Sequence, residues 1–317
     1  MKSTVLITGG TGFLGKRLAL ALKDSHQVIL TGRNNKQNQQ AAKFTGCQVA
    51  PMDVARYESV RDVFAEFRPK LVIHAAATKF VDLAEKFPME CIDVNVIGSQ
   101  NVARVAIDHK AETVIGISTD KAAPPVRNTY GMSKSLMERL FCSMDAKSAT
   151  RFACVRYGNV AWSTGSVFPI WRKMHAETGV IGTTGPEMRR FFFTVDDAVN
   201  LVMTCMQNID ALGGRVLSRR MKAAQLSDFL NEWIQIHGGT YSRIAGRPGE
   251  REDEFLIGDL ELPYTHEIIY SDIIHYVISF NEKALNPVTT GLSSANTDRL
   301  TQKEIAQIIT SPPEEEL

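Results

Sequence analysis

The sequence has almost no excess of charge of either sign. Its 317 residues include 36 lysines and arginines against 35 aspartates and glutamates, a formal net charge of +1 at pH 7. It therefore lacks the basic surplus of a nucleic-acid-binding surface. No apolar run reaches the ~20 residues of a membrane-spanning helix, and no leader-like segment precedes the first expected strand at Thr4. We predict a cytoplasmic protein that contacts neither nucleic acid nor membrane.

Cysteine is scarce and shows none of the spacings that indicate a metal site or a disulfide framework. The five cysteines are odd in number and contain no CxxC pair, and the seven histidines show no metal-ligand spacing. We therefore expect reduced thiols and no metal. What the chain does have is 44% hydrophobic residues, enough to build one large domain or two modest ones.

The N-terminal segment combines a buried strand, a glycine-rich turn and a helix. Thr4–Thr8 is the strand, Gly9, Gly12 and Gly15 follow it, and apolar residues then recur through Leu18–Leu22. Such glycines let backbone N–H groups approach a pyrophosphate, whose charge the helix N-terminus favours. This pattern predicts dinucleotide binding. The residues expected at the cofactor are Gly9, Thr11, Gly12, Phe13 and Leu14.

The second expected strand, Gln27–Thr31, is followed by basic residues at the point where a carboxylate would bind the ribose diol of NAD. Arg33 and Lys36 lie there, and no acidic residue appears before Asp53. Cationic donors suit a 2′-phosphate, so we predict NADP in preference to NAD. The third expected strand, Cys47–Val54, ends in Asp53, and both Asp53 and Val54 are expected at the cofactor. Asp53 either accepts a hydrogen bond from the adenine amine or caps the next helix.

The fourth expected strand, residues 70–77, ends in small residues that would let the backbone pass close to the cofactor. Those expected to contact it are Ala75, Ala76 and Ala77. We interpret His74 as a packed strand residue rather than a base. Asn95 and Asn101 fall within a helix expected over 88–109, where a polar asparagine indicates a hydrogen bond to nearby active-site backbone.

Two pairs of proton-handling side chains lie close together in the sequence. Tyr130 and Lys134 are four residues apart, so both lie on one helix face, where the ammonium favours the phenolate and makes the tyrosine a base. Asp120 and Lys121 follow the expected strand Thr113–Ser118, at the edge where open parallel sheets bind ligands. Together they predict chemistry with several proton transfers. The alternative for Asp120 and Lys121 is a solvated ion pair.

Strands alternate with helices through the first half of the chain, which predicts the α/β class and a doubly wound parallel sheet of Rossmann type. We assign residues 1–160 to a cofactor-binding domain with return segments near 191–218. Residues 161–317 are assigned mainly to a smaller, interleaved mixed α/β substrate-binding domain. Within the return segments, Thr194–Val199 is expected to start an aspartate-capped helix and Gly213–Leu217 to form a short strand.

These motifs together resemble the extended short-chain dehydrogenase/reductases, and among them the inverting UDP-N-acetylglucosamine 4,6-dehydratases. The matching segments cover nearly the whole chain in order. They are ITGGTG (7–12), HAAA (74–77) with Lys79 and Ala84-Glu85, STDKAA (118–123), Tyr130-Gly131 with Lys134, VRYGNV (155–160), Gly165-Ser166-Val167 with Pro169, and RPGE (247–250). The Asp120-Lys121 pair discriminates most strongly. Retaining dehydratases carry Asp-Glu there, and sugar epimerases usually carry neither an acid nor a base.

The resemblance implies NADP-dependent dehydration of UDP-N-acetylglucosamine with inversion at C5. Oxidation at C4 makes the C5 hydrogen acidic. Tyr130 would take the 4-hydroxyl proton, Lys134 would hold the nicotinamide ribose, and Thr119 would hydrogen-bond to the 4-oxygen. Lys121 would remove the C5 proton, so it must be neutral, with a pKa lowered by burial and by Lys134 nearby. Asp120 would protonate the departing 6-hydroxyl.

The same resemblance implies a nucleotide-sugar site and an oligomer. The residues expected at the sugar nucleotide are Lys79, Asn159, Val167, Arg190, Arg247 and Glu250. Guanidinium groups match diphosphate oxygens, which favours the two arginines. Lys79 is either a substrate contact or a surface charge, and Asn159 either binds the diphosphate or only builds a turn. Relatives associate through helices of the cofactor domain, so we expect at least a dimer.

The chain departs from the family pattern at several points, including an Asp120-to-Tyr130 interval of ten residues, about one longer than usual. Those at Thr164 and Glu187 leave the sugar nucleotide and the product open. Pro124-Pro125 replaces Asn-Pro, Thr164 stands where an arginine is expected, and Glu187 stands where a similar stretch begins with arginine. One alternative is a 4-epimerase or 4-keto reductase that uses only Tyr130 and Lys134. Another is a dehydratase that releases a 5,6-ene or retains the C5 configuration. A third is a non-catalytic, NADP-sensing scaffold.

Overall fold

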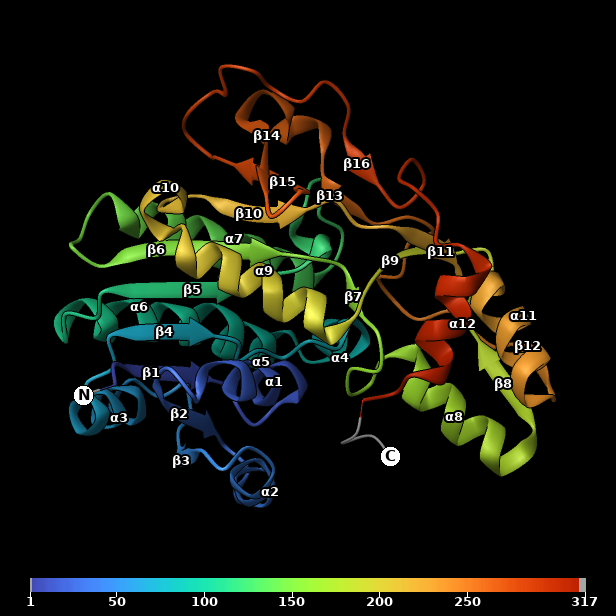
Figure 1. Ribbon diagram of the computed structural model, residues 1–317, viewed down its shortest axis with the longest axis horizontal. Helices are drawn as coiled ribbons and strands as arrows, with labels where there is room; N and C mark the ends of the chain where they lie inside the picture. Colours follow the sequence, from blue (N-terminus) through green and yellow to red (C-terminus); the bar gives the residue numbers. More distant parts are fainter. Residues whose placement is uncertain (1, 314–317) are drawn as a thin grey trace.

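A computed structural model describes residues 2–313 as a large twisted sheet with a smaller lobe beside the carboxyl ends of its strands (Figure 1). Nine strands form the sheet, in the order β14-β15-β10-β6-β5-β4-β1-β2-β3. Those from β10 to β3 run parallel, and β14 and β15 add an antiparallel hairpin at one edge. The strands are β1 (Thr4–Thr8), β2 (Gln27–Gly32), β3 (Gln48–Pro51), β4 (Leu71–His74), β5 (Thr113–Ile117), β6 (Arg151–Arg156), β10 (Val216–Arg219), β14 (Thr265–Tyr270) and β15 (Ile273–Ile278).

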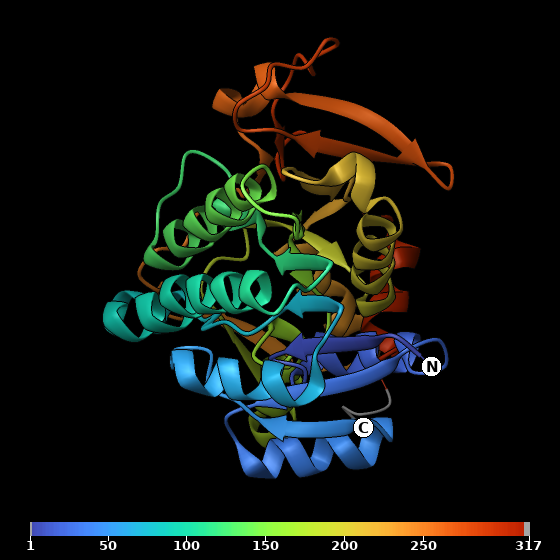
Figure 2. The ribbon, with the colours of Figure 1, turned by 90° about the vertical axis from the view of Figure 1, so that its left-hand side faces the viewer.

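Helices cover both faces of this sheet (Figure 2). On one face α1 (Phe13–Leu22) packs between α2 (Asn35–Thr45) and α9 (Val195–Gln207). On the other, α6 (Gly98–Asp108) packs between α3 (Tyr57–Phe67) and α7 (Thr129–Asp145). The central strands are buried on both sides, as apolar runs such as Val5-Leu6-Ile7 require. The doubly wound α/β fold predicted from the sequence is confirmed.

The chain order places a topological reversal between β1 and β4. Helices after β1 and β2 lie on one face, and those after β3, β4 and β5 lie on the other, so the two loops that follow β1 and β4 diverge. A crevice opens between such loops at the carboxyl ends of the strands, where sheets of this type bind ligands. The sheet thus fixes where the site lies.

The smaller lobe has its own aromatic core. Phe168, Trp171, Phe192, Phe229 and Trp233 are buried against one another. Its elements are β7 (Asn159–Val160), α8 (Val167–Thr178), β8 (Val180–Thr183), β9 (Arg189–Phe193), β11 (Ala223–Gln225), α11 (Leu226–His237), β12 (Thr240–Arg243) and α12 (Gln302–Thr310). The remaining elements are α4 (Val81–Lys86), α5 (Pro88–Ile92), a short π-helix (Asp93–Ile97), a 3₁₀ turn (Asp120–Ala122), α10 (Ile209–Leu212), β13 (Phe255–Ile257), a 3₁₀ helix (Asp259–Tyr264) and β16 (Leu292–Ser293).

Some local expectations hold and others do not. The helix start at Thr194 is confirmed, because its hydroxyl and the Asp197 carboxylate form a capping box. The expected strand over 70–77 stops at His74. The Ala75 amide still makes a ladder bond to the Thr8 carbonyl, but the Ala76 amide donates to the Thr8 hydroxyl instead of to a strand carbonyl. The β14–β15 hairpin was not predicted. Between residues 2 and 313 no helix is long and apolar enough to cross a membrane, and no metal-binding cluster of side chains occurs.

Candidate active site

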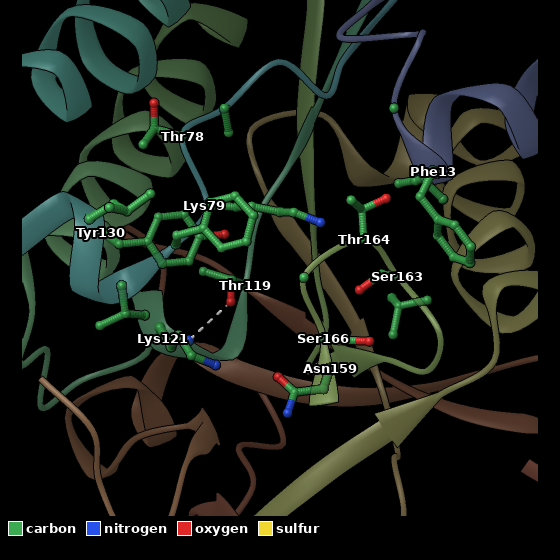
Figure 3. Close-up of a pocket in the computed structure, with 18 of the residues that line it drawn as sticks. Phe13, Thr78, Lys79, Thr119, Lys121, Tyr130, Asn159, Ser163, Thr164 and Ser166 are labelled. Atoms are coloured by element: carbon green, nitrogen blue, oxygen red, sulfur yellow. Dashed lines mark hydrogen bonds between the residues drawn. The ribbon is translucent and has the colours of Figure 1, made fainter. Parts of the chain in front are cut away.

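A cavity of about 1150 Å³ lies between the carboxyl ends of the strands and the smaller lobe. Its walls come from the loops after β1, β2, β4, β5 and β7, from the start of α7, and from the segment after β12. Figure 3 shows Tyr130, Thr119 and Lys121 on one side of this space and Asn159, Ser163 and Ser166 on another, with the Lys79 side chain extending between them. One cavity therefore collects most of the residues singled out in the sequence.

The glycine turn at the start of α1 has the geometry that a dinucleotide needs. Gly9 has φ +63°, and a Cβ there would lie 2.7 Å from the Ala76 backbone. A Cβ at Gly15 would lie 2.5 Å from Gly10, so the helix could not approach the turn. Gly12 is the N-cap of α1 and provides no capping side chain, which leaves the first-turn amides available to a phosphate. Lining the cavity here are Gly9, Thr11, Gly12, Phe13 and Leu14.

The end of β2 brings only part of the expected cationic pair to the cavity. Arg33 lines the cavity, and its guanidinium lies 3.2 Å from the carboxylate of Glu90 with both side chains about half exposed. Lys36 does not line it. Val54 lines it and Asp53 does not. The Asp53 carboxylate accepts from the Ala55 amide at 3.1 Å. Asp53 is therefore not the cap of α3, whose N-cap is Arg56.

The polar residues around β4 act as supports for the site backbone. His74 is fully buried and contacts the hydroxyls of Thr8 at 2.8 Å and Ser99 at 3.0 Å. Burial and the charge of Lys134 lower the pKa of His74 to about 3, so it stays neutral. The predicted packed role of His74 is confirmed. Ala75, Ala76 and Ala77 all line the cavity.

The two asparagines also bond as predicted to backbone beside the cavity. Asn95 accepts from the Thr78 amide at 2.8 Å and donates to the Thr78 carbonyl at 3.0 Å. Asn101 donates to the Val54 carbonyl at 2.9 Å. Since Thr78 and Val54 line the cavity, these side chains hold two of its walls in place.

Asp120 and Lys121 form a buried ion pair, not a solvated one. The 3₁₀ turn after β5 directs Asp120 into the interior, where its side chain is fully buried. Asp120 Oδ1 accepts from Lys121 Nζ at 3.0 Å and from the Thr119 hydroxyl at 2.9 Å, while Oδ2 has no hydrogen-bond partner among residues 2–313. Moving both charges out of water costs free energy. The folding of the surrounding residues must offset this cost for the ion pair to stay buried.

The lowered pKa expected for Lys121 is wrong. Burial lowers the pKa of Lys121, but Asp120 and a second carboxylate, Glu254, outweigh burial, and its pKa lies above that of an ordinary lysine. Glu254 Oε1 lies 3.6 Å from Lys121 Nζ. Lys134, the cation expected to lower this pKa, is not among the groups that act on Lys121.

Tyr130 and Lys134 share the cavity but do not act on each other as expected. Burial raises the pKa of Tyr130 to about 12, and the opposing effects come from the charge of Lys121 and a hydrogen bond with Thr119. The lowered pKa expected for Tyr130 is therefore wrong, and Lys134 is not among the main groups that act on it. Lys134 Nζ instead donates to the Ile117 carbonyl at 2.7 Å, and burial lowers the pKa of Lys134 to about 8.

The expected sugar-nucleotide residues all line the cavity: Lys79, Asn159, Val167, Arg190, Arg247 and Glu250. The Arg190 guanidinium already bonds to backbone and is less available to a diphosphate. Its terminal nitrogens donate to the carbonyls of Arg189, Arg251 and Glu252. Arg247 and Glu250 close a turn at the rim, where the Arg247 amide donates to the Glu250 carboxylate at 3.0 Å.

Sequence reasoning missed two residues that the fold brings to the cavity. Glu254 lies in an acidic run, Glu250 to Glu254, that is typical of a solvated loop, and nothing local marks its last member as buried. Ser166 lies before the first residue of α8, and its hydroxyl is buried with no hydrogen-bond partner in the described part of the chain. The only signal for Ser166 was its place in the segment Gly165-Ser166-Val167.

Comparisons with known proteins identify the family of the chain. A family model described as polysaccharide biosynthesis protein matches residues 5–275. The chain is 33% identical to a UDP-N-acetylglucosamine 4,6-dehydratase (inverting) of Campylobacter jejuni, over 90% of this chain and 87% of that protein. It is also 36% identical to a UDP-glucose 4-epimerase of Rickettsia bellii, over 96% of this chain and 95% of that one.

Among solved structures, Pen from Bacillus thuringiensis superposes with a TM-score of 0.88 at 28% identity, covering 97% of each chain. The resemblance stated from the motifs is thereby confirmed. The chain belongs to the polysaccharide biosynthesis protein family of extended short-chain dehydrogenase/reductases.

Proposed function

We propose that the protein is an NADP-dependent UDP-N-acetylglucosamine 4,6-dehydratase that inverts C5. The observation that carries this proposal is the ion pair of Asp120 and Lys121, with 3.0 Å between Oδ1 and Nζ. Lys121 lines the same cavity as Tyr130, and the fully buried Asp120, which does not line it, lies against Lys121. An epimerase needs a base at the 4-hydroxyl only. A dehydratase needs in addition a base for C5 and an acid for the 6-hydroxyl, and this pair supplies both.

The pair can reach its reactive state without a change in total charge. Transfer of one proton across the 3.0 Å hydrogen bond converts the Lys121 ammonium and the Asp120 carboxylate into an amine and a carboxylic acid. Lys121 then removes the C5 proton, and Asp120 gives its proton to the 6-hydroxyl, which leaves as water. Elimination restores the original ion pair. When C6 then accepts hydride, C5 takes a proton from solvent on the opposite face, which gives the inverted configuration. The proton that Tyr130 took from the 4-hydroxyl returns to solvent, so no net proton is gained or lost over the turnover.

Tyr130 and Thr119 serve the 4-position in this proposal. Tyr130 takes the 4-hydroxyl proton, and Thr119 orients the 4-oxygen from the carboxyl end of β5. Bound NADP would supply the hydride acceptor for C4 and the hydride donor for C6. The glycine turn, Arg33 and Lys134 are the residues we propose to hold it, because the turn accommodates a pyrophosphate and Arg33 provides a cation after β2.

For the sugar nucleotide we favour Arg247 over Arg190. Arg190 already donates to backbone carbonyls, whereas Arg247 lies at the rim in a turn in which Gly249 has φ +80°. We propose that Arg247, Lys79 and the first turn of α8 at Val167 bind the diphosphate, and that Asn159 contacts the sugar. We also propose a homo-oligomer, because apolar side chains of α5 and α7, including Met89 and Leu136, are exposed.

The test is conversion of UDP-N-acetylglucosamine by the purified chain with NADP, followed by mass spectrometry. We expect a product lighter by one water, and we expect Lys121→Met, which retains Tyr130 and Lys134, to abolish it. The similarity to the Rickettsia bellii epimerase supports one rival, a 4-epimerase. Its signature would be a product of unchanged mass that Lys121→Met still forms.

A further inference from the structure

Glu254 is a buried carboxylate that the proposed chemistry does not yet use. Its side chain is 3% exposed, it lines the cavity, and its Oε1 lies 3.6 Å from Lys121 Nζ. Its Oε2 has no hydrogen-bond partner in the described chain and lies 4.0 Å from the Arg251 guanidinium. A buried charge is rarely retained without a partner that needs it, and the charged group closest to Glu254 on the cavity side is Lys121.

The backbone around Glu254 is fastened to two other parts of the lobe. The Glu254 amide donates to the Ser294 hydroxyl at 3.0 Å, and the Ser294 amide donates to the Glu254 carbonyl at 2.8 Å. Arg190 donates to the carbonyls of Arg251 and Glu252, just before it. These bonds involve backbone, not the Glu254 carboxylate, so that carboxylate is positioned but remains available to Lys121.

The charged and titratable groups that face Lys121 come from four elements. Asp120 lies on its own 3₁₀ turn, Glu254 on the segment before β13, Arg190 on β9 and Tyr130 on α7. In the reactive state Asp120 has accepted a proton and is neutral. Glu254 is then the one carboxylate among these groups that still carries a negative charge beside Lys121.

We infer that Glu254 is a positioning residue that acts through Lys121, and that its fixed carboxylate makes Lys121 a stronger base for the C5 proton. This inference rests on the proposed dehydratase function. When Lys121 accepts the C5 proton it becomes an ammonium, and a carboxylate 3.6 Å away stabilises that positive charge as it forms. The same carboxylate keeps Lys121 protonated at low pH, where the enzyme is consequently slower.

The inference predicts that the pH profiles of wild type and Glu254→Gln cross. Loss of an opposite charge at this distance lowers a lysine pKa by about one to three units, so the acidic limb of turnover moves to lower pH by that amount. At high pH the Asp120–Lys121 pair loses the one proton that the proposed reaction moves between its members. Loss of the Glu254 charge makes this happen at lower pH, so the variant is the slower enzyme there. A purely structural loss would lower turnover at every pH.

The test compares full-length wild type, Glu254→Gln, Glu254→Asp and Glu252→Gln. Glu252 is the matched control, because its carboxylate lies two residues away and is 63% exposed. Turnover of UDP-N-acetylglucosamine is measured against pH. In parallel, the pH dependence of acetylation of Lys121 by acetic anhydride is followed by peptide mass spectrometry, which needs no turnover.

We expect Glu254→Gln alone to show a turnover profile that crosses that of wild type and a Lys121 acetylation midpoint lower by about one to three units, and Glu254→Asp to restore both. An unchanged midpoint, or identical profiles for the Gln and Asp variants, would overturn the inference. A shifted midpoint without turnover in any protein would retain the charge coupling and reject the dehydratase proposal, so the two failures are distinguishable.

Discussion

Asp120 and Lys121 are adjacent in sequence and still form a direct ion pair, with 3.0 Å between Oδ1 and Nζ and the Asp120 side chain wholly buried. Neighbouring residues on a strand point to opposite faces. The 3₁₀ turn that follows β5 is what turns both side chains toward one another at the cavity. In the proposed reaction, this local geometry provides an acid and a base at one point.

Asp120→Asn and Lys121→Met should fail at different steps. Without Asp120 the 6-hydroxyl lacks its acid, so dehydration should fall by about 10²- to 10⁴-fold, while Lys121 can still exchange the C5 hydrogen. Without Lys121, both the dehydration and the exchange of the C5 hydrogen should stop. Deuterium incorporation at C5 of UDP-N-acetylglucosamine, measured beside product formation, checks this. Equal loss of exchange in both variants would contradict the separate roles.

Arg33 should distinguish NADP from NAD, and Lys36 should not. Arg33 lines the cavity, whereas Lys36 does not, so only the first can meet a 2′-phosphate. A hydrogen bond to a charged group contributes about 1.5–3 kcal/mol, so Arg33→Ala should weaken NADP binding by roughly 10- to 100-fold and leave NAD binding nearly unchanged. Calorimetric titration of both cofactors measures this, with Lys36→Ala as the control.

Glu90 should oppose NADP binding, because its carboxylate forms an ion pair with the Arg33 guanidinium at 3.2 Å and so competes with the 2′-phosphate. Glu90→Gln removes that competition, so we expect tighter binding of NADP and no change for NAD in the same titration. Weaker NADP binding by the Glu90→Gln variant would mean that the carboxylate orients Arg33 instead of competing for it.

The fold, the glycine turn and the supporting asparagines could be predicted because each depends on a local pattern. Glu254 and Lys121 are brought together only by the tertiary fold, so neither the burial of Glu254 nor the pKa of Lys121 was predictable. The same is true of Arg190, whose type fits a diphosphate but whose donors are used by the backbone of residues 251 and 252. Charge state and availability depend on neighbours that no local pattern specifies.

His74 should make stability fall as pH falls. Its pKa is lowered to about 3 in the folded chain, against 6.5 ordinarily, so between these values the unfolded chain binds more protons and stability is lost as pH drops. From pH 7 to pH 5 the loss should be about 2 kcal/mol. Urea unfolding of wild type and His74→Gln at both pH values checks this. A slope that is the same in both proteins would contradict it.

The buried guanidinium of Arg156 should be essential for stability. It donates to Glu138 on α7 and to Glu261 on the 3₁₀ helix Asp259–Tyr264 at 2.6–2.9 Å, and the Arg156 side chain is fully buried. Arg156→Met leaves two buried carboxylates unpaired and should cost about 3–5 kcal/mol. Denaturant unfolding measures this. The exposed pair Lys173–Glu177 is the control, and Glu177→Gln should have little effect.

Proton NMR of UDP-N-acetylglucosamine incubated with the protein and NADP in deuterium oxide is the most direct test of the proposed dehydratase activity. We predict a new 6-methyl signal, deuterium at C5, and ring couplings of the inverted configuration. A 6-methyl with the original configuration would contradict the inversion, and an exocyclic alkene signal would indicate a released 5,6-ene. A product epimerised at C4 with its 6-hydroxyl intact would contradict the dehydratase account itself.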